Sequence, residues 1–262
     1  MNIACFGDNC VDSYRETGEV FPGGNPVNVA ACLRRLGERA SYLGAVGDDP
    51  NGAFLLAALR GKGVDVSHVR VVRGSTAVSY ISVVGGERTF TGFEEGVMAD
   101  YRPGAEDIDF ICRHDLAVTG LWGRSESALE AIRRRGVPTA YDASDDPFGS
   151  IAASALPHAT LFFFSDPDSG DDEIRDKLTR LRALGPDTVT ATRGGRGSMC
   201  FDGASFYTAG IVPCEVVDTM GAGDSYIAGF LAAWLGGRPL PDCMRAGAES
   251  AAVTIGHSGA WE

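Results

Sequence analysis

The sequence lacks any C-x-x-C pair, although it contains seven cysteines. They are scattered along the chain at positions 5, 10, 32, 112, 200, 214 and 243. An odd number of dispersed cysteines argues against a disulfide framework. We therefore expect free thiols, and we interpret Cys10 as a small buried side chain rather than a reactive one.

Positive charge is also scarce. The chain has 23 Lys and Arg against 35 Asp and Glu, which gives a formal net charge of −12. This balance argues against wrapping around nucleic acid or lying on an anionic membrane. The longest apolar runs are too short to span a bilayer, and the opening MNIACFGDN is typical of a strand rather than of a secretory leader. We expect a cytoplasmic protein with no nucleic-acid or membrane partner.

An alternation of short apolar strands with amphipathic helices runs through the chain. Helices are expected in GGNPVNVAACLRRLG, at Ala53 to Leu59, near Ser127 with a capping box to Glu130, after Asp171, and from about Ala222 and Pro241. The strand-like segments are 3–7, 42–46, 116–119, 139–141, 161–164 and 189–192, and a late hairpin surrounds Gly203. This order predicts one α/β domain over residues 1–262, with a mostly parallel central sheet and helices on both faces.

One segment interrupts this alternation. TAVSYISVV and ERTFTGF, within residues 76–93, are rich in β-branched and aromatic side chains and are joined by Gly85 and Gly86. This pattern predicts a hairpin. Together with about residues 10–22 it is expected to form a small β lid.

The most informative motif is DTMGAGDSYIAGF, from Asp218 to Phe230. Gly221, Ala222 and Gly223 form a tight turn at the start of a helix, where unpaired amides and the helix dipole favour an anion. A carboxylate at Asp224 beside a phosphate is explained if it takes a proton from a hydroxyl during phosphoryl transfer. An acid in a first helical turn is otherwise ordinary compensation of the dipole.

Further polar groups follow the expected strands at one edge of the sheet, where open α/β sheets bind ligands. They are Asp8, Asp12, Asp142, Ser165 to Asp168, and Thr192 to Gly197.

Together with GGNPVNVA at residues 23–30, the D-T-x-G-A-G-D string resembles the ribokinase-like (PfkB) family of sugar kinases. The resemblance implies a ribokinase-like fold and ATP-dependent phosphorylation of a sugar hydroxyl, with Asp224 as base. It also implies that Asp12, Gly24, Asn25 and Asn28 bind the sugar.

The string T-R-G-G-R-G at 192–197 resembles the family's nucleotide loop, which is not a P-loop because no G-K-[ST] follows. The resemblance assigns Thr192, Gly194 and Gly197 to the ATP phosphates. It places Gly256 and Ser258, in the C-terminal tail, beside the adenine. Arg193 is a further candidate for the phosphates or a solvated side chain.

Two metal ions are implied by the same resemblance. The family's N-x-x-E segment, which organises Mg²⁺, corresponds here to Ser165-Asp-Pro-Asp168, so Asp168 is the expected contact. Since Mg²⁺ keeps several waters and needs few carboxylates, the shorter side chain is compatible with binding. Asp218 is expected near a monovalent cation such as K⁺.

Within the family, GDNCVD at 7–12 and FEEGVMADY at 93–101 resemble the kinases of fructosyl-amines such as fructoselysine, phosphorylated on O6. Such a substrate carries a cationic amine, which Asp8, Glu94 or Glu95 would meet, and Trp122 would pack on the sugar face. A homodimer through the lid is also expected.

Three alternatives stay open. The chain is a kinase for fructose, an aminosugar or a nucleoside, a sugar sensor without turnover, or an oxidoreductase that binds a dinucleotide through its GAG turn. The last reading is disfavoured because Tyr226 stands where a third glycine belongs and the motif does not follow the first strand.

Overall fold

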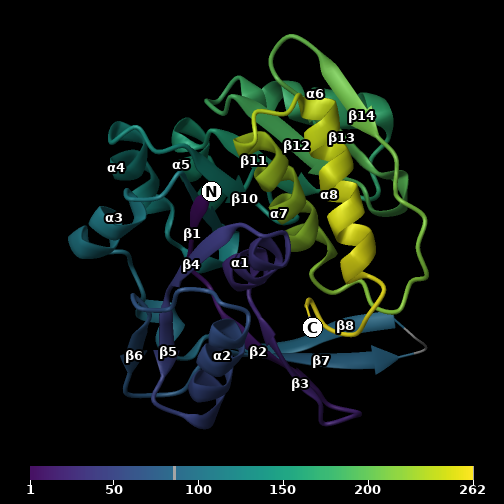
Figure 1. The fold of residues 1–262 in the computed structure, drawn as a ribbon. Helices are drawn as coiled ribbons and strands as arrows, with labels where there is room; N and C mark the ends of the chain where they lie inside the picture. Colours follow the sequence, from purple (N-terminus) through teal and green to yellow (C-terminus); the bar gives the residue numbers. More distant parts are fainter. Residues whose placement is uncertain (85–86, 262) are drawn as a thin grey trace.

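The computed structural model describes residues 1–84 and 87–261, which contain a central eight-stranded sheet (Figure 1). Its strand order is β14-β13-β12-β11-β10-β9-β1-β4, and among these strands only β13 runs opposite to the others, so that it pairs antiparallel with both β12 and β14. The strands are β1 (Asn2–Phe6), β4 (Arg39–Leu43), β9 (Leu116–Gly120), β10 (Thr139–Asp142), β11 (Leu161–Ser165), β12 (Thr188–Thr192), β13 (Ser198–Phe201) and β14 (Phe206–Ala209). The predicted mostly parallel sheet is confirmed.

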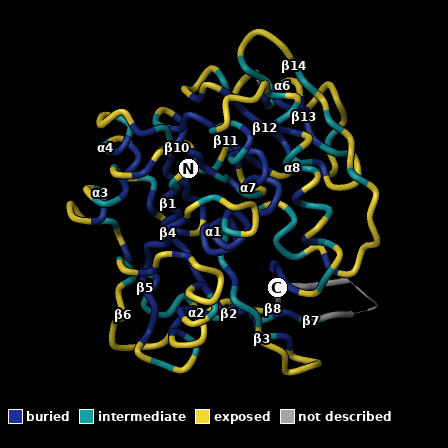
Figure 2. Tube along the Cα trace, viewed as in Figure 1, coloured by how far each residue is buried: buried dark blue, intermediate teal, exposed yellow. Residues whose placement is uncertain are grey.

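Helices cover both faces of this sheet, so its side chains are buried on both sides (Figure 2). Along β1, Ile3 and Cys5 join one hydrophobic cluster, and Ala4 and Phe6 join the other. The first cluster includes side chains of α1 (Asn25–Arg35), α2 (Pro50–Gly61), α7 (Ala222–Leu235) and α8 (Leu240–Thr254). The second includes side chains of α3 (Ala105–Ile111), α4 (Leu129–Arg134), α5 (Ser150–Ala155) and α6 (Asp171–Arg182).

The end of α1 is tied to α7 and α8. The Arg35 guanidinium donates to Ser225 Oγ at 2.9 Å and to Thr254 Oγ1 at 3.1 Å. Arginine suits this role because its planar fork carries several donors in fixed directions. These contacts fix the start of α7 relative to α1, and both helix starts lie at the site described below.

A second sheet has the order β3-β2-β7-β8. Its strands are β2 (Cys10–Tyr14), β3 (Val20–Gly23), β7 (Val78–Val84) and β8 (Glu87–Glu94), and a small pair is formed by β5 (Ala45–Gly47) and β6 (Arg70–Val72). The predicted association of residues 10–22 with 76–93 agrees with these pairings. The predicted turn at Gly85 and Gly86 lies outside the described residues. Since β2 follows β1 after three residues, this sheet extends from the carboxyl edge of the central sheet (Figure 1).

The predicted capping box at Ser127 is wrong. Residues Glu126–Ala128 form a 3₁₀ turn, α4 begins at Leu129, and no side chain caps it. Other short elements, which lack a clear hydrophobic period, were not expected from the sequence: α3, α5, β6 and the 3₁₀ turns Gly96–Asp100, Leu121–Gly123, Leu156–His158 and Gly194–Arg196. None of the helices in the described ranges is long and apolar enough to cross a membrane.

Candidate active site

Two pockets meet at the carboxyl edge of the central sheet. The larger has a volume of about 780 Å³ and lies against the starts of α7 and of the 192–197 loop. The smaller, of about 630 Å³, lies between the second sheet and the start of α1. Asp142, Ser144 and Asp224 line both pockets. These three side chains therefore lie where a group bound in one pocket would meet a group bound in the other.

Asp224 is held by two asparagines from the other end of the chain. Asn25 Nδ2 donates to its Oδ1 at 2.7 Å, and Asn28 Nδ2 donates to its Oδ2 at 2.7 Å. Trp261 Nε1 donates in turn to Asn28 Oδ1 at 2.9 Å, which fixes the orientation of that amide. Each carboxylate oxygen accepts one of these hydrogen bonds and has a further lone pair for a ligand. The Asp224 side chain is thus oriented before any substrate binds.

Asn25 also joins Asp224 to two more carboxylates. Its backbone N–H donates to Asp8 Oδ2 at 2.9 Å, and its Nδ2 donates to Asp142 Oδ2 at 2.8 Å. The preceding Gly24 has φ of 105°, and a Cβ there would lie 2.6 Å from the Cα of Asn9. Only glycine fits this position, so Gly24 sets the path that brings Asn25 among the three aspartates.

Burial raises the pKa of all three carboxyls. The pKa of Asp224 is raised to about 6 by desolvation, which the hydrogen bonds from Asn28 and Asn25 partly offset. Desolvation and the charge of Asp224 raise the pKa values of Asp8 and Asp142 to about 7 each. A carboxyl with a pKa near 6 is ionised at neutral pH and is still basic enough to accept a proton from an alcohol in a transition state.

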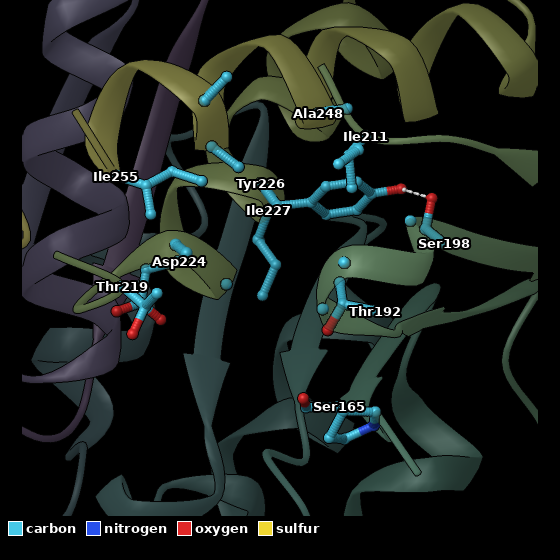
Figure 3. Close-up of a pocket in the computed structure, with 18 of the residues that line it drawn as sticks. Ser165, Thr192, Ser198, Ile211, Thr219, Asp224, Tyr226, Ile227, Ala248 and Ile255 are labelled. Atoms are coloured by element: carbon cyan, nitrogen blue, oxygen red, sulfur yellow. Dashed lines mark hydrogen bonds between the residues drawn. The ribbon is translucent and has the colours of Figure 1, made fainter. Parts of the chain in front are cut away.

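The start of α7 forms one wall of the larger pocket (Figure 3). Gly221 has φ of 70°, and a Cβ there would lie 2.4 Å from Ala260 Cβ. A Cβ on Gly223 would meet nothing within 4 Å, so a ligand has room to approach the backbone. Ala222 N–H donates to Thr219 O at 3.3 Å, which is a long hydrogen bond. Gly221, Ala222 and Gly223 therefore lie at the start of a helix, the end at which unpaired backbone N–H groups favour an anion.

Part of the lining of the larger pocket is apolar. Ile211, Val216 and Ile255 line it, together with Tyr226, whose hydroxyl donates to Ser198 Oγ at 2.9 Å (Figure 3). A flat apolar base fits such a wall.

The nucleotide residues expected from the sequence divide into two groups. Thr192, Gly194 and Gly197 line the larger pocket. Gly256 and Ser258 do not, and Ala252 and Ile255 lie there in place of them. The Arg193 side chain is buried and donates to Asp171 at 2.5 Å. It is therefore not solvated, and it does not line the larger pocket.

The smaller pocket is lined by six of the predicted sugar contacts: Asp8, Asp12, Gly24, Asn25, Asn28 and Trp122. Glu94 and Glu95 do not line it. Glu95 forms an ion pair with Arg124 at 2.5 Å, and Glu94 accepts from the Tyr80 hydroxyl at 3.0 Å. Asp142 and Asp145 also line it. Asp142 was among the polar groups expected at this edge of the sheet, but neither residue was expected to contact the sugar. The signal for Asp142 was its place at the end of an apolar strand.

The two carboxylates predicted to contact metal ions, Asp168 and Asp218, differ in their surroundings. Asp168 is exposed and lines neither pocket. The carboxylate of Asp218 is buried and accepts from the backbone N–H groups of Met220 at 2.6 Å and Gly259 at 2.8 Å. Over residues 1–84 and 87–261, no three His, Cys, Asp or Glu side chains are grouped so that they could hold a metal ion.

Comparison with known proteins agrees with this geometry. The model of a family described as "pfkB family carbohydrate kinase" matches residues 3–262. A fructoselysine 6-kinase of Shigella flexneri is 40% identical over 259 residues, which cover 99% of each chain. A fructosamine kinase of Bacillus subtilis is 34% identical, with 100% of this chain and 93% of the relative covered.

Similar folds are known among solved structures. The ribokinase of Arabidopsis thaliana complexed with ribose and ATP has a TM-score of 0.87 at 22% identity, covering 98% of this chain and 93% of that one. An adenosine kinase of Sinorhizobium meliloti has a TM-score of 0.86 at 25% identity, covering 100% and 95%. The predicted ribokinase-like fold is confirmed.

The raised pKa values predict how stability depends on pH. Asp8 has a folded-state pKa of about 7 against an ordinary value of 3.8, so between these values the folded state binds more protons than the unfolded state. The stabilisation that the folded state gains from proton binding at Asp8 is therefore fully present below pH 3.8 and is lost as the pH rises through about 7.

Asp8→Asn removes the buried charge. We therefore expect the Tm of the variant minus the Tm of the wild type to increase as the pH rises from 5 to 8. Thermal melts at both values measure this difference. Asp145→Asn, at an exposed carboxylate of the same pocket, serves as control and should follow the wild-type profile. A difference between Asp8→Asn and the wild type that does not change with pH would contradict a raised pKa.

Proposed function

Because the chain belongs to the pfkB family of carbohydrate kinases, we propose that it transfers the γ-phosphoryl group of ATP to O6 of a fructosyl-amine such as fructoselysine. The observation that carries the proposal is the position of Asp224, which lines both pockets and is held by two asparagines. The names of the two relatives given above support the acceptor.

In the proposed reaction the sugar occupies the smaller pocket, with O6 beside Asp224. The hydroxyl proton passes to the carboxylate as the O6–phosphorus bond forms and the bond from the γ-phosphorus to the bridging oxygen of ADP breaks. Asn25 and Asn28 keep the carboxylate oriented toward the hydroxyl throughout. Such phosphoryl transfer relies mainly on positioning and electrostatic stabilisation.

ATP is proposed to fill the larger pocket. Its base packs on the wall of Ile211, Val216 and Ile255, and its phosphates run past Thr192 and Gly194 to the start of α7. There the helix end and the open approach at Gly223 favour the charge that develops on the transferring group.

The residues present fit Mg²⁺ only as an ion bound chiefly by phosphates and water. Ser165 and Asp168 belong to the segment that corresponds to the family's metal segment, and Ser165 lines the larger pocket. When bound, Mg²⁺ would neutralise phosphate charge. K⁺ beside Asp218 and a dimer through the second sheet stay predictions.

The proposed function is tested by an ATP-coupled assay on fructoselysine, fructose and ribose. We expect fructoselysine to have the highest kcat/KM and its product to carry phosphate on O6, which ³¹P and ¹³C NMR identify. Efficient turnover of the simple sugars alone would overturn the acceptor and leave the kinase assignment in place. Sugar binding without turnover of any of them would instead favour a sensor.

The role of Asp224 is tested by Asp224→Asn. Loss of the base should lower kcat by roughly 10²- to 10⁴-fold, the usual contribution of a positioned acid–base group, and leave the dissociation constants for ATP and sugar largely unchanged. Stopped-assay rates and calorimetry give the two quantities. The matched control is Asp242→Asn, which changes the first-turn aspartate of the neighbouring α8 and should keep normal turnover. Near-normal turnover in Asp224→Asn would remove Asp224 from the role of base.

The pKa of Asp224, about 6, predicts the acid limb of the pH–rate profile. Only the ionised carboxylate accepts a proton, so kcat should rise with pH through an apparent pKa at or above about 6 and then level off. The negative phosphates of bound ATP would move this value upward. Steady-state rates from pH 5 to 8.5 measure it, and a flat profile over that range would contradict the assignment.

A further inference from the structure

The smaller pocket is lined by five carboxylates, those of Asp8, Asp12, Asp142, Asp145 and Asp224. Among the described residues that line it, none is Lys, Arg or His. Neutral sugars need hydrogen-bond partners but no net charge. A pocket with this surplus of negative charge is complementary to a substrate that carries a cation.

Four of the five carboxylates are already engaged or open to water. Asp224 is assigned to the hydroxyl that reacts. Asp142 accepts from Asn25 Nδ2 at 2.8 Å and from Ser144 N–H at 2.9 Å, one bond on each oxygen. Asp12 Oδ1 accepts from Cys10 Sγ at 3.4 Å, and Asp145 is exposed, where water screens its charge.

Asp8 differs from the other four. Like Asp12 it is 5% exposed, but while its Oδ2 accepts from the Asn25 backbone, its Oδ1 has no hydrogen-bond partner in the part of the chain that the structure describes. A buried acceptor without a partner is costly unless a ligand supplies the donor. Asp8 also lies close enough to Asp224 for repulsion between their charges, which a bound cation would relieve.

We propose that Asp8 is a specificity-determining residue that binds the secondary ammonium group of the fructosyl-amine and selects it over neutral ketoses. The inference rests on the proposed function and names the residue that recognises the amine. An ammonium group only donates hydrogen bonds, and its charge lowers the pKa of a neighbouring carboxyl, so Asp8 binds it as a charged acceptor at a site where water does not compete.

The Asp8→Asn variant distinguishes a charged ligand from a neutral one. Its carbonyl oxygen can still accept from the Asn25 backbone, while its NH₂ group replaces the unpartnered oxygen. A sugar hydroxyl or an ether oxygen can accept from that NH₂ group, but an ammonium cannot. A residue that only supported the loop would affect charged and neutral ligands alike.

The test compares two ligands of the same shape: fructoselysine, and an analogue in which an ether oxygen replaces the amine NH. Calorimetric Kd values for both ligands, and KM and kcat for fructoselysine, are measured on wild type and Asp8→Asn. Asp8→Asn should weaken the binding of fructoselysine and so raise its Kd and KM by roughly 10²-fold, as expected when a buried charge loses its partner. The Kd of the ether and the kcat should change little.

Two outcomes would overturn the role of Asp8: an equal loss for both ligands, or no loss for either. Asp12→Asn is the matched comparison, because the loss of a residue that binds hydroxyls should weaken the binding of both ligands equally. If Asp8→Asn fails to fold, the wild type still decides, since it should bind the amine at least tenfold more tightly than the ether and equal affinities would refute the proposal. The proposed function fails separately, if wild type does not phosphorylate fructoselysine at all.

Discussion

Two hydrogen bonds hold the site together, those from Asn25 and Asn28 to the carboxylate of Asp224. They join the start of α1 to the start of α7, which lie almost 200 residues apart along the chain. The fold makes this contact available, because α1 begins directly after β3 of the second sheet and α7 begins after the segment that follows β14, and both helix starts lie at the carboxyl edge of the central sheet. Arg35 then fixes the far end of α1 against α7 and α8. The orientation of one carboxylate therefore depends on the packing of the whole helical layer.

The same contact accounts for the electrostatics of the site. Asn25 holds Asp8 through its backbone N–H and Asp142 and Asp224 through its side-chain amide. Burial raises all three pKa values, and the charge of Asp224 adds to the rise at Asp8 and Asp142. Charge repulsion of this kind is unfavourable for folding, but it prepares a site for ligands that bring protons or positive charge. A hydroxyl that gives up its proton and an ammonium on the same substrate supply both.

Much of this arrangement was predictable from the sequence, because it is encoded locally. The alternation of strands and helices predicted the sheet, and the sequence from Gly221 to Asp224 predicted the start of the helix. The contacts of several other side chains depend on distant parts of the chain. Arg193 was open to two readings, and only the fold brings Asp171 to it. Glu95 pairs with Arg124, which no local pattern indicates, and Gly256 and Ser258 lie just past the turns of α8 that line the pocket. Asp142 was visible at a strand end, but its link to Asn25 was not.

The proposed reaction requires that Asp224 contact the acceptor hydroxyl at the place where that hydroxyl faces the phosphoryl donor. A crystal structure with fructoselysine and a non-hydrolysable ATP analogue tests it most directly. We expect O6 within hydrogen-bonding distance of Asp224, roughly 2.6–3.2 Å, with the terminal phosphate facing the amides at the start of α7. A complex with O6 turned away from Asp224, or with the phosphates outside the pocket at Gly223, would contradict the account.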